Sequence, residues 1–366
     1  MPTAAVIQAL ESDTLLDITG GCDLFIYEQS VRSMGVFRLR GTAEFPAFWE
    51  GVINQGDKSQ LKIRWGIATE EGLREGCSWH PVFLTRALLH YQGANVVRID
   101  IEGADSAYKL LEKETDKAYS NSLISEIVAE IAHRNKLQAV LSPTEGRGDY
   151  WQRCESDIEF IRKRLLPLAV GTDGRKDFMF YIDGDILHFH PPNLKQQPAK
   201  LDASPRPSGA FRDWPAIMTL VYDRGKALPL GILPMKGRGF DMLRKECVVC
   251  STIEPAVDWS LSRPAIQQAP LLGRPIPFPR QQQLRRDEVQ NYIDVLWGQN
   301  RRQLVTARLI IPGHLKVKVG DIADVICYDA EGKPKLGAGK YLIAGATHKI
   351  RSGHYQIILT LERWGI

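Results

Sequence analysis

The closing stretch GKYLIAGATHKIRSGHYQIILTLER, residues 339–363, decides the fold class. Two apolar-rich runs, 340–350 and 353–363, flank Arg351 and Ser352. Long runs rich in β-branched and aromatic residues, separated by a short polar turn, predict a β-hairpin. We therefore expect a strand-rich protein whose last fifty residues complete a sheet, with backbone edges as its working surface.

Further strands are predicted upstream, where apolar and polar side chains alternate. Successive side chains of a strand point to opposite faces, so this pattern buries one face and leaves the other in solvent. The predicted strands are 37–40, 61–65, 96–101, 216–222 with a return near 228–232, 304–311, and 316–321 leading into 323–328. Segment 82–91 fits a strand or a buried helix, and we favour the strand.

A different pattern covers residues 115–192. Apolar residues at helical spacing predict a helix over 121–133, which Ser120 or Ser122 could cap. A second helix over 155–166 begins with acids and ends with bases, as the helix dipole favours. The turn Asp183-Gly184-Asp185 between two apolar runs then predicts a hairpin over 178–190. These elements form a compact helix, helix and hairpin unit.

Two polar or proline-rich segments interrupt the remainder. Residues 193–213 are rich in Pro, Lys, Gln and Ser, which indicates a linker or long loop. Residues 262–280 carry five prolines and are expected to run over a surface or against a neighbouring subunit, because proline cannot donate a hydrogen bond inside a sheet. A further helix is predicted over 285–300.

Composition excludes several classes of protein. The chain has 366 residues, 44% hydrophobic and 25% charged, which is typical of two or three globular domains. Its net charge of +4 is too even for a dedicated nucleic-acid surface, and the pairs Arg285-Arg286 and Arg301-Arg302 are expected to be solvated. No signal peptide or transmembrane run is predicted.

The cysteines do not form a disulfide framework. They are scattered along the chain, which favours synthesis in a reduced cytoplasm. The six are Cys22, Cys77, Cys154, Cys247, Cys250 and Cys327.

No motif predicts catalysis, a cofactor or a metal. Cys247 and Cys250 form a lone CxxC without a second pair at zinc-site spacing. His188 and His190 share one face of a strand, yet no acidic ligand accompanies them, so packing or surface placement is favoured. Asp183-Gly184-Asp185 fits a turn better than a calcium loop, and Gly146-Arg147-Gly148 is too short for a phosphate loop. GxSxG and HExxH are absent from the sequence.

Five segments, in this order, resemble the tail hub proteins of contractile-tailed phages, the late control protein D and type VI spike hub family. They are NSLISEIVAEIAHRNKL, ESDIEFIRKRLLPLA, FMFYIDGDILHFHPP, VKVGDIADVI and GKYLIAGATHKIRSGHYQIILTLER. The resemblance covers 115–192 and 304–363, and elsewhere it extends only to strand-rich character.

The resemblance implies a mainly β fold with an α/β insertion. Its expected domains are a first tube-like β-barrel (1–114), the inserted unit (115–192) and a second barrel with a proline-rich segment (193–366); residues 216–255 belong either to the second barrel or to the first. It also implies a baseplate hub, assembled in the host cytoplasm, in which a homotrimer forms a pseudo-sixfold ring. The implied partners are the tail tube or its initiator, the central spike and other baseplate subunits, with DNA passing through the channel without specific binding.

Alternatives remain at this point. Arg38, Arg40, Lys62, Arg64, Lys316 and Lys318 could line a channel, although solvated outer faces are favoured. A tail-tip enzyme that degrades cell wall is the second candidate function, and a monomeric receptor-binding module is the third.

Overall fold

The computed structural model describes most of the chain. The described residues are 3–11, 13–43, 46–55, 60–69, 72–92, 96–192, 198–202, 217–224, 236–241, 244–251, 275–276, 286–302, 305–313, 316–329, 331–335 and 337–363. The predicted strand return near 228–232 and most of 262–280 lie outside them. Within the described ranges, no helix has both the length and the apolar character needed to cross a membrane.

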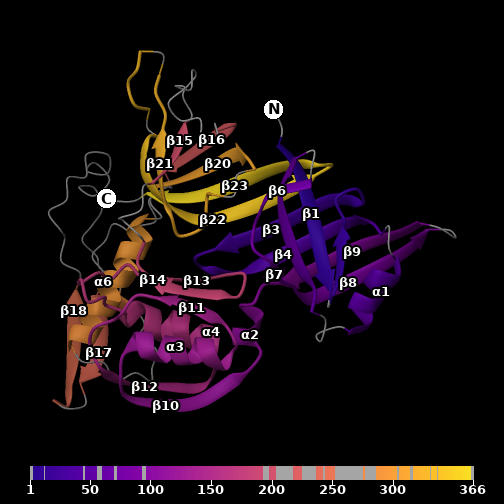
Figure 1. Cartoon of the computed structure of the whole chain (residues 1–366). Coiled ribbons are helices and arrows are strands. Elements are labelled where there is room, and N and C mark those ends of the chain that lie inside the picture. Colours follow the sequence, from indigo (N-terminus) through magenta and orange to yellow (C-terminus); the bar gives the residue numbers. More distant parts are fainter. Residues whose placement is uncertain are drawn as a thin grey trace.

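One large, mostly antiparallel sheet dominates the molecule (Figure 1). Its main path runs β6 (Gly72–Gly76), β5 (Lys62–Thr69), β1 (Thr3–Glu11), β23 (His354–Arg363), β22 (Gly339–Arg351), β3 (Cys22–Ser30), β4 (Ser33–Thr42), β9 (Val96–Ala104) and β8 (Phe83–Gln92). Branches add β2 (Thr14–Asp17), β7 (His80–Pro81), β15 (Ala199–Asp202), β16 (Thr219–Arg224), β20 (Val305–Pro312) and β21 (Ile322–Ile326). Helix α1 (Pro46–Gln55) lies near β8 and β9.

The predicted closing hairpin is confirmed, and it joins the two ends of the chain. The first part of β22 pairs with β21, and its later part pairs with β3. Strand β23 pairs with β20 along most of its length and with β1 at its start. The hairpin is therefore shared by strands from the first hundred residues and from the last sixty, in one continuous sheet. The division into two separate barrels stays a prediction.

The hairpin turn places two residues in the left-handed region. Ser352 has φ +47° and Gly353 has φ +75°. Two-residue hairpin turns favour this conformation at both positions, with Asn then Gly as the preferred pair. Serine meets the requirement less well than asparagine because asparagine tolerates positive φ more readily.

We therefore expect Ser352→Asn to raise the free energy of unfolding by about 0.5–1 kcal/mol, the gain that follows from a several-fold preference. Chemical denaturation of the two proteins measures it. Ser352→Val is the matched control and should destabilise, since β-branched residues are disfavoured at positive φ. An unchanged midpoint for both variants would contradict the assigned turn.

An aromatic cluster fills the core under the sheet. Tyr27, Phe37, Trp65, His80 and Tyr355 are each at most 2% exposed. The rings of Tyr27 and Phe37 stack at 4.3 Å between centroids, and Trp65 lies 5.1 Å from Tyr27. This packing explains the alternation in the sequence, because every second side chain of β3, β4 and β5 enters the cluster.

The helix, helix and hairpin unit is also present, as residues 114–190. It contains β10 (Glu114–Ser122), α3 (Ile124–Arg134), β11 (Gln138–Leu141), β12 (Gly148–Ser156), α4 (Asp157–Phe160), β13 (Met179–Asp183) and β14 (Ile186–His190), and the short α2 (Tyr108–Leu111) precedes it. β10 pairs with β12, and β11, β14 and β13 form a second sheet. The predicted hairpin over 178–190 is therefore confirmed.

Both helices of the unit differ in detail from the prediction. Leu123, not a serine, precedes α3, so the predicted serine cap is wrong. Other side chains take its place: the Thr144 hydroxyl accepts from the Ser125 backbone N–H at 3.0 Å, and the Glu126 carboxylate accepts from the Leu123 N–H at 3.0 Å. The second helix starts only at Asp157, because 155–156 continue strand β12. It then widens into a π-helical turn, Ile161–Leu165, and ends in a 3₁₀ turn, Leu166–Leu168, at Pro167.

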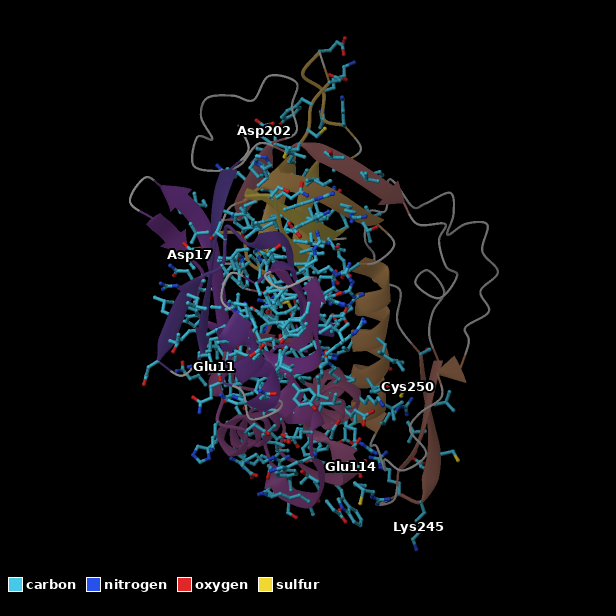
Figure 2. All side chains as sticks on the ribbon, turned by 90° about the vertical axis from the view of Figure 1, so that its right-hand side faces the viewer. Glu11, Asp17, Glu114, Asp202, Lys245 and Cys250 are labelled. Carbon is cyan, nitrogen blue, oxygen red and sulfur yellow. The ribbon has the colours of Figure 1, made fainter. Side chains whose placement is uncertain are left out.

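Segments from after the predicted linker pack onto this unit. Helix α6 (Arg286–Arg302) and strand β18 (Glu246–Ser251) contribute Val248, Cys250, Val289 and Ile293 to the same hydrophobic cluster as α3 and α4. β18 pairs with β17 (Lys236–Asp241), which also meets β19 (Pro275–Ile276). Figure 2 shows Cys250 beside α6 and Lys245 at the tip of the β17–β18 hairpin. The predicted helix over 285–300 is confirmed.

Two predictions about strands near the chain's middle and end are wrong. Residues 199–202, placed in a linker, form β15 parallel to β21, because Ala199 and Leu201 are buried against the sheet. Residues 316–321, predicted as a strand, form turns in which Val317 and Val319 are buried without pairing. Segment 82–91, by contrast, is strand β8 as favoured.

Candidate functional site

Five neighbouring strands, β22, β3, β4, β9 and β8, present a charged surface to solvent, which we call the open face. Along β4, exposed Arg38 and Arg40 alternate with buried Phe37 and Leu39. The register places partners from the other strands beside these arginines. The open face comprises Leu24, Ile26, Arg38, Arg40, Arg86, Leu88, His90, Arg98, Asp100, Glu102, Lys349 and Arg351.

Cross-strand ion pairs order the centre of the open face. Arg40 Nε lies 3.1 Å from Asp100 Oδ2, and Arg38 Nε lies 4.0 Å from Glu102 Oε1. Both pairs join residues that stand opposite each other on β4 and β9. Exposed pairs of this kind contribute at most about 1 kcal/mol each, so they organise the surface more than they stabilise the fold.

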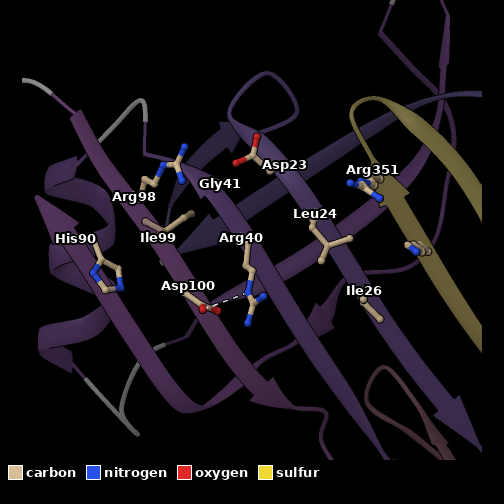
Figure 3. Close-up of a pocket in the computed structure, with 11 residues that line it drawn as sticks. Asp23, Leu24, Ile26, Arg40, Gly41, His90, Arg98, Ile99, Asp100 and Arg351 are labelled. Carbon is tan, nitrogen blue, oxygen red and sulfur yellow. Dashed lines mark ion pairs between the residues drawn. The ribbon is translucent and has the colours of Figure 1, made fainter. Parts of the chain in front are cut away.

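A hollow of about 640 Å³ opens on this face (Figure 3). Leu24 and Ile26 of β3 lie in it, between β4 on one side and β22 on the other. Its charged lining consists of Asp23, Arg40, His90, Arg98, Asp100, Lys349 and Arg351.

The structure brings together only two of the six basic residues considered for a channel. Arg38 and Arg40 share the open face. Arg64, on β5, lies with its guanidinium carbon 4.5 Å from the centre of the Trp79 ring and donates to Gln8 at 2.7 Å. Lys62 is also on β5, away from the open face, and Lys316 lies in a turn. Lys318 Nζ is 3.8 Å from Asp183 Oδ2.

A second polar site, which we call the junction, fastens the unit of residues 114–190 to the large sheet. Its anchor is the turn between β13 and β14. Asp183 Oδ1 lies 3.2 Å from His80 Nε2, and Asp185 Oδ1 accepts from the Ser106 hydroxyl at 2.6 Å and from Lys109 Nζ at 3.2 Å. Gln29 Nε2 donates to the Ile182 carbonyl at 2.6 Å. The Asp-Gly-Asp sequence thus forms the predicted turn and also supplies two carboxylates that bind across the junction.

Geometry fixes the charge of His80. Its Nδ1 lies 2.8 Å from the Ser78 carbonyl oxygen, which can only accept, so Nδ1 carries a proton. Nε2 faces the Asp183 carboxylate and therefore donates as well, which makes the ring an imidazolium. Burial alone would lower the pKa of His80, but the hydrogen bond to Asp183 outweighs it and raises the pKa to about 10. Burial likewise opposes ionisation of Asp183, yet the His80 bond lowers its pKa to about 2.

A second buried histidine stays neutral. His348 is 8% exposed, and its Nδ1 lies 2.7 Å from the Tyr355 hydroxyl. Burial, with a smaller contribution from the charge on His80, lowers the pKa of His348 to about 3. The two histidines of this core therefore differ in charge at neutral pH because only His80 reaches a carboxylate.

The remaining motifs show packing roles. His188 Nδ1 and His190 Nε2 lie 3.3 Å apart, and the His188 ring stacks on Tyr181 at 4.5 Å. Cys247 is exposed and Cys250 is buried on β18, so their thiols do not converge. No group of three or more metal-ligating side chains occurs in the described part of the chain.

His80 does not stand out in the sequence, and Asp105 carries only a local turn signal. His80 finds its partner 103 positions away, which no local pattern reveals. Asp105, at 1% exposure, accepts from the backbone N–H groups of Gly35 and Ala107 at 2.9 Å each. Burial raises the pKa of Asp105 to about 7 despite these bonds. Asp105 lies three residues before the start of α2, and an aspartate there favours such a turn, so the sequence carries this local signal.

Comparison with known proteins extends these observations. No protein-family model matches the sequence, and no curated protein matches it. Among solved structures, a tail protein from Neisseria meningitidis MC58 superposes with a TM-score of 0.67 at 10% identity, covering 99% of this chain and 98% of that one. The 43 kDa tail protein of prophage MuSo2 from Shewanella oneidensis gives 0.67 at 11% identity, with 98% of each chain covered.

A third similar structure comes from a secretion machine. The E. coli c3393 protein, a component of the type VI secretion system, gives a TM-score of 0.55 at 12% identity over 94% of this chain and 74% of that one. At such identities the likeness shows the fold alone. The chain therefore has the fold of phage tail and type VI secretion proteins along nearly its whole length.

Proposed function

We propose that this chain is a structural subunit of the baseplate hub of a contractile injection machine. Three copies form a ring with pseudo-sixfold character and a central channel, and the ring joins the tail tube to the central spike. The observation that carries the proposal is the superposition of 98% or more of this chain on two phage tail proteins of nearly equal extent.

The open face supports the channel part of the proposal. It is a continuous surface of five strands, and cross-strand ion pairs at its centre hold Arg38 and Arg40. Such a surface stays hydrated and, among the described residues, offers no aromatic platform for bases, so DNA would pass along it without specific binding. We place the open face toward the channel and the unit of residues 114–190 on the outside.

Unpaired strand edges support the assembly part of the proposal. Within the described residues, β16 pairs only with β20 and β8 pairs only with β9. Met218 and Val221 beside and within β16, and Tyr91 in β8, are more than half exposed. An edge with exposed apolar side chains invites pairing, and a neighbouring subunit that covers it prevents uncontrolled association. The tube, its initiator, the spike and other baseplate subunits are the further partners, in a virion assembled in the host cytoplasm.

The assembly is tested first by mass. Light scattering of the purified protein at micromolar concentration should give three times the 41.2 kDa chain mass. A monomer under these conditions would favour a receptor-binding module instead. Replacing both Met218 and Val221 with Lys should shift the mass toward the monomer, whereas Val140→Lys and Val249→Lys, on other exposed surfaces, serve as controls.

The non-enzymatic nature of the subunit has its own test. Purified protein incubated with peptidoglycan should release no soluble fragments above a heat-treated control. Release that persists after further purification would support the tail-tip enzyme instead.

A further inference from the structure

The hollow of the open face combines an apolar floor with a basic rim. Leu24 and Ile26 point to the solvent side of the sheet, and both are only half-buried. Their cross-strand neighbours are Arg40 and Arg38 on one side and Arg351 and Lys349 on the other. Covering two adjacent apolar side chains within a charged surface removes them from water and therefore favours the binding of an apolar ligand group.

The rim carries an excess of positive charge. Arg40 is engaged by Asp100, but Arg98, Lys349 and Arg351 have no carboxylate within 4.0 Å among the described residues. Among the described lining residues, Asp23 is the one carboxylate outside the Arg40–Asp100 pair. Positive side chains that lack partners favour a negatively charged ligand, and their charge speeds its approach.

We propose that this hollow binds an acidic segment of a partner protein, in which apolar side chains alternate with Asp or Glu. In an extended segment, alternate side chains point the same way, so apolar residues would cover Leu24 and Ile26. The acidic side chains would then point away from the sheet, and the long side chains of Arg98, Lys349 and Arg351, which rise from the rim, would reach them and the backbone between them. The 640 Å³ volume is within the range of sites for small ligands and suits a few residues of such a segment.

The lining favours a peptide over nucleic acid. Single-stranded nucleic acid is bound largely by stacking of bases on aromatic side chains. Among the described residues, no Phe, Tyr or Trp lines the hollow, and the one ring that does is that of the exposed His90. Leu24 and Ile26 would instead lie against sugar and phosphate, which are polar.

This inference rests on the proposed function, because the open face must stay uncovered in the assembled ring. Its probe is a fluorescein-labelled peptide, Gly-Glu-Leu-Glu-Leu-Glu-Gly, followed by fluorescence anisotropy as the full-length protein is added. Three matched probes are used: one with Lys for Glu, one with Ser for Leu, and a labelled single-stranded oligonucleotide of equal charge.

The test uses paired variants. Arg98→Glu together with Arg351→Glu should weaken binding of the acidic peptide about tenfold or more. Lys113→Glu together with Arg153→Glu changes the net charge by the same amount, at exposed positions in or next to the 114–190 unit, and should leave peptide binding unchanged. Leu24→Ser should weaken binding of the Leu-containing peptide and leave the Ser-containing peptide unaffected. Melting curves establish that each variant is folded.

The outcomes separate this inference from the proposed function. Three results would each overturn the inference: no binding of the acidic peptide, equal binding of the oligonucleotide, or equal loss of affinity in both double variants. If the same sample still forms rings, the proposed function stands without the inference. If the monomer bound the peptide and the assembled ring did not, the open face would be covered in the ring. That result contradicts both the inference and the proposed function.

Discussion

Replacing His80 with Gln is expected to lower the free energy of unfolding by about 2–4 kcal/mol. Removing one partner of a buried ion pair costs about 3–5 kcal/mol, because the other charge stays buried without its partner. Asp183 retains some exposure, 23% of its side chain, and Lys318 lies 3.8 Å away, so the expected loss is somewhat smaller. Thermal and chemical denaturation measure it.

A double-mutant cycle isolates the pair. Asp183→Asn and the combined variant complete the cycle, and the coupling energy should exceed about 1 kcal/mol. His90→Gln, on the open face, is the control and should change the free energy of unfolding by less than about 0.5 kcal/mol. A coupling energy near zero would show that the junction does not depend on this pair.

The pH dependence has a defined sign. The pKa of His80 is raised in the folded state to about 10, so the contribution of His80 to the free energy of unfolding is complete below the unfolded pKa of 6.5. It then falls as pH rises through about 10. The pKa of Asp183 is lowered to about 2, so its stabilising contribution is present above the unfolded pKa of 3.8 and is lost as pH falls through 2. The stability difference between wild type and His80→Gln should therefore be largest from about pH 4 to 6.5 and shrink toward pH 10.

Gly35→Ala is expected to destabilise the protein by about 2–4 kcal/mol. A Cβ at this position would lie 2.9 Å from the Tyr27 hydroxyl and would also overlap the Asp105 carboxylate, a far closer approach than atoms tolerate. Both groups are buried, so the added methyl must displace a carboxylate that accepts from two backbone N–H groups. The expected loss combines overpacking with unsatisfied buried donors.

Gly51→Ala is the matched control. Gly51 lies inside α1, and a Cβ there would meet no atom within 4 Å. Alanine favours a helix interior over glycine, so this variant should gain about 0.5–1 kcal/mol. The two Gly→Ala changes should therefore have opposite signs in the same denaturation experiment. Equal, small effects would contradict the packing around Asp105.

Much of the fold follows from local pattern, and the exceptions have identifiable physical causes. Alternation predicts β4 and β5 because one face of each enters the aromatic core. Residues 316–321 alternate equally well, yet their backbone bonds β22 only at Gly320 and Asp321, through Ile343, and Val317 and Val319 are buried without pairing. Conversely, β15 is too short and too polar to predict, and it exists because β21 offers a parallel edge.

The sites were predictable to a lesser degree. Arg38 and Arg40 are recognisable in the sequence as exposed strand residues, but their partners on β9 depend on register. The pairing of His80 with Asp183 depends on how the β13–β14 turn meets the large sheet, which is a tertiary property. Sequence pattern therefore locates the turn and misses the contact that makes it important.

Electron microscopy of the purified protein tests the central claim most directly. The proposed hub predicts particles of threefold symmetry with six similar lobes around a central hole. Single compact particles without a hole, at concentrations where light scattering finds one chain mass, would contradict it.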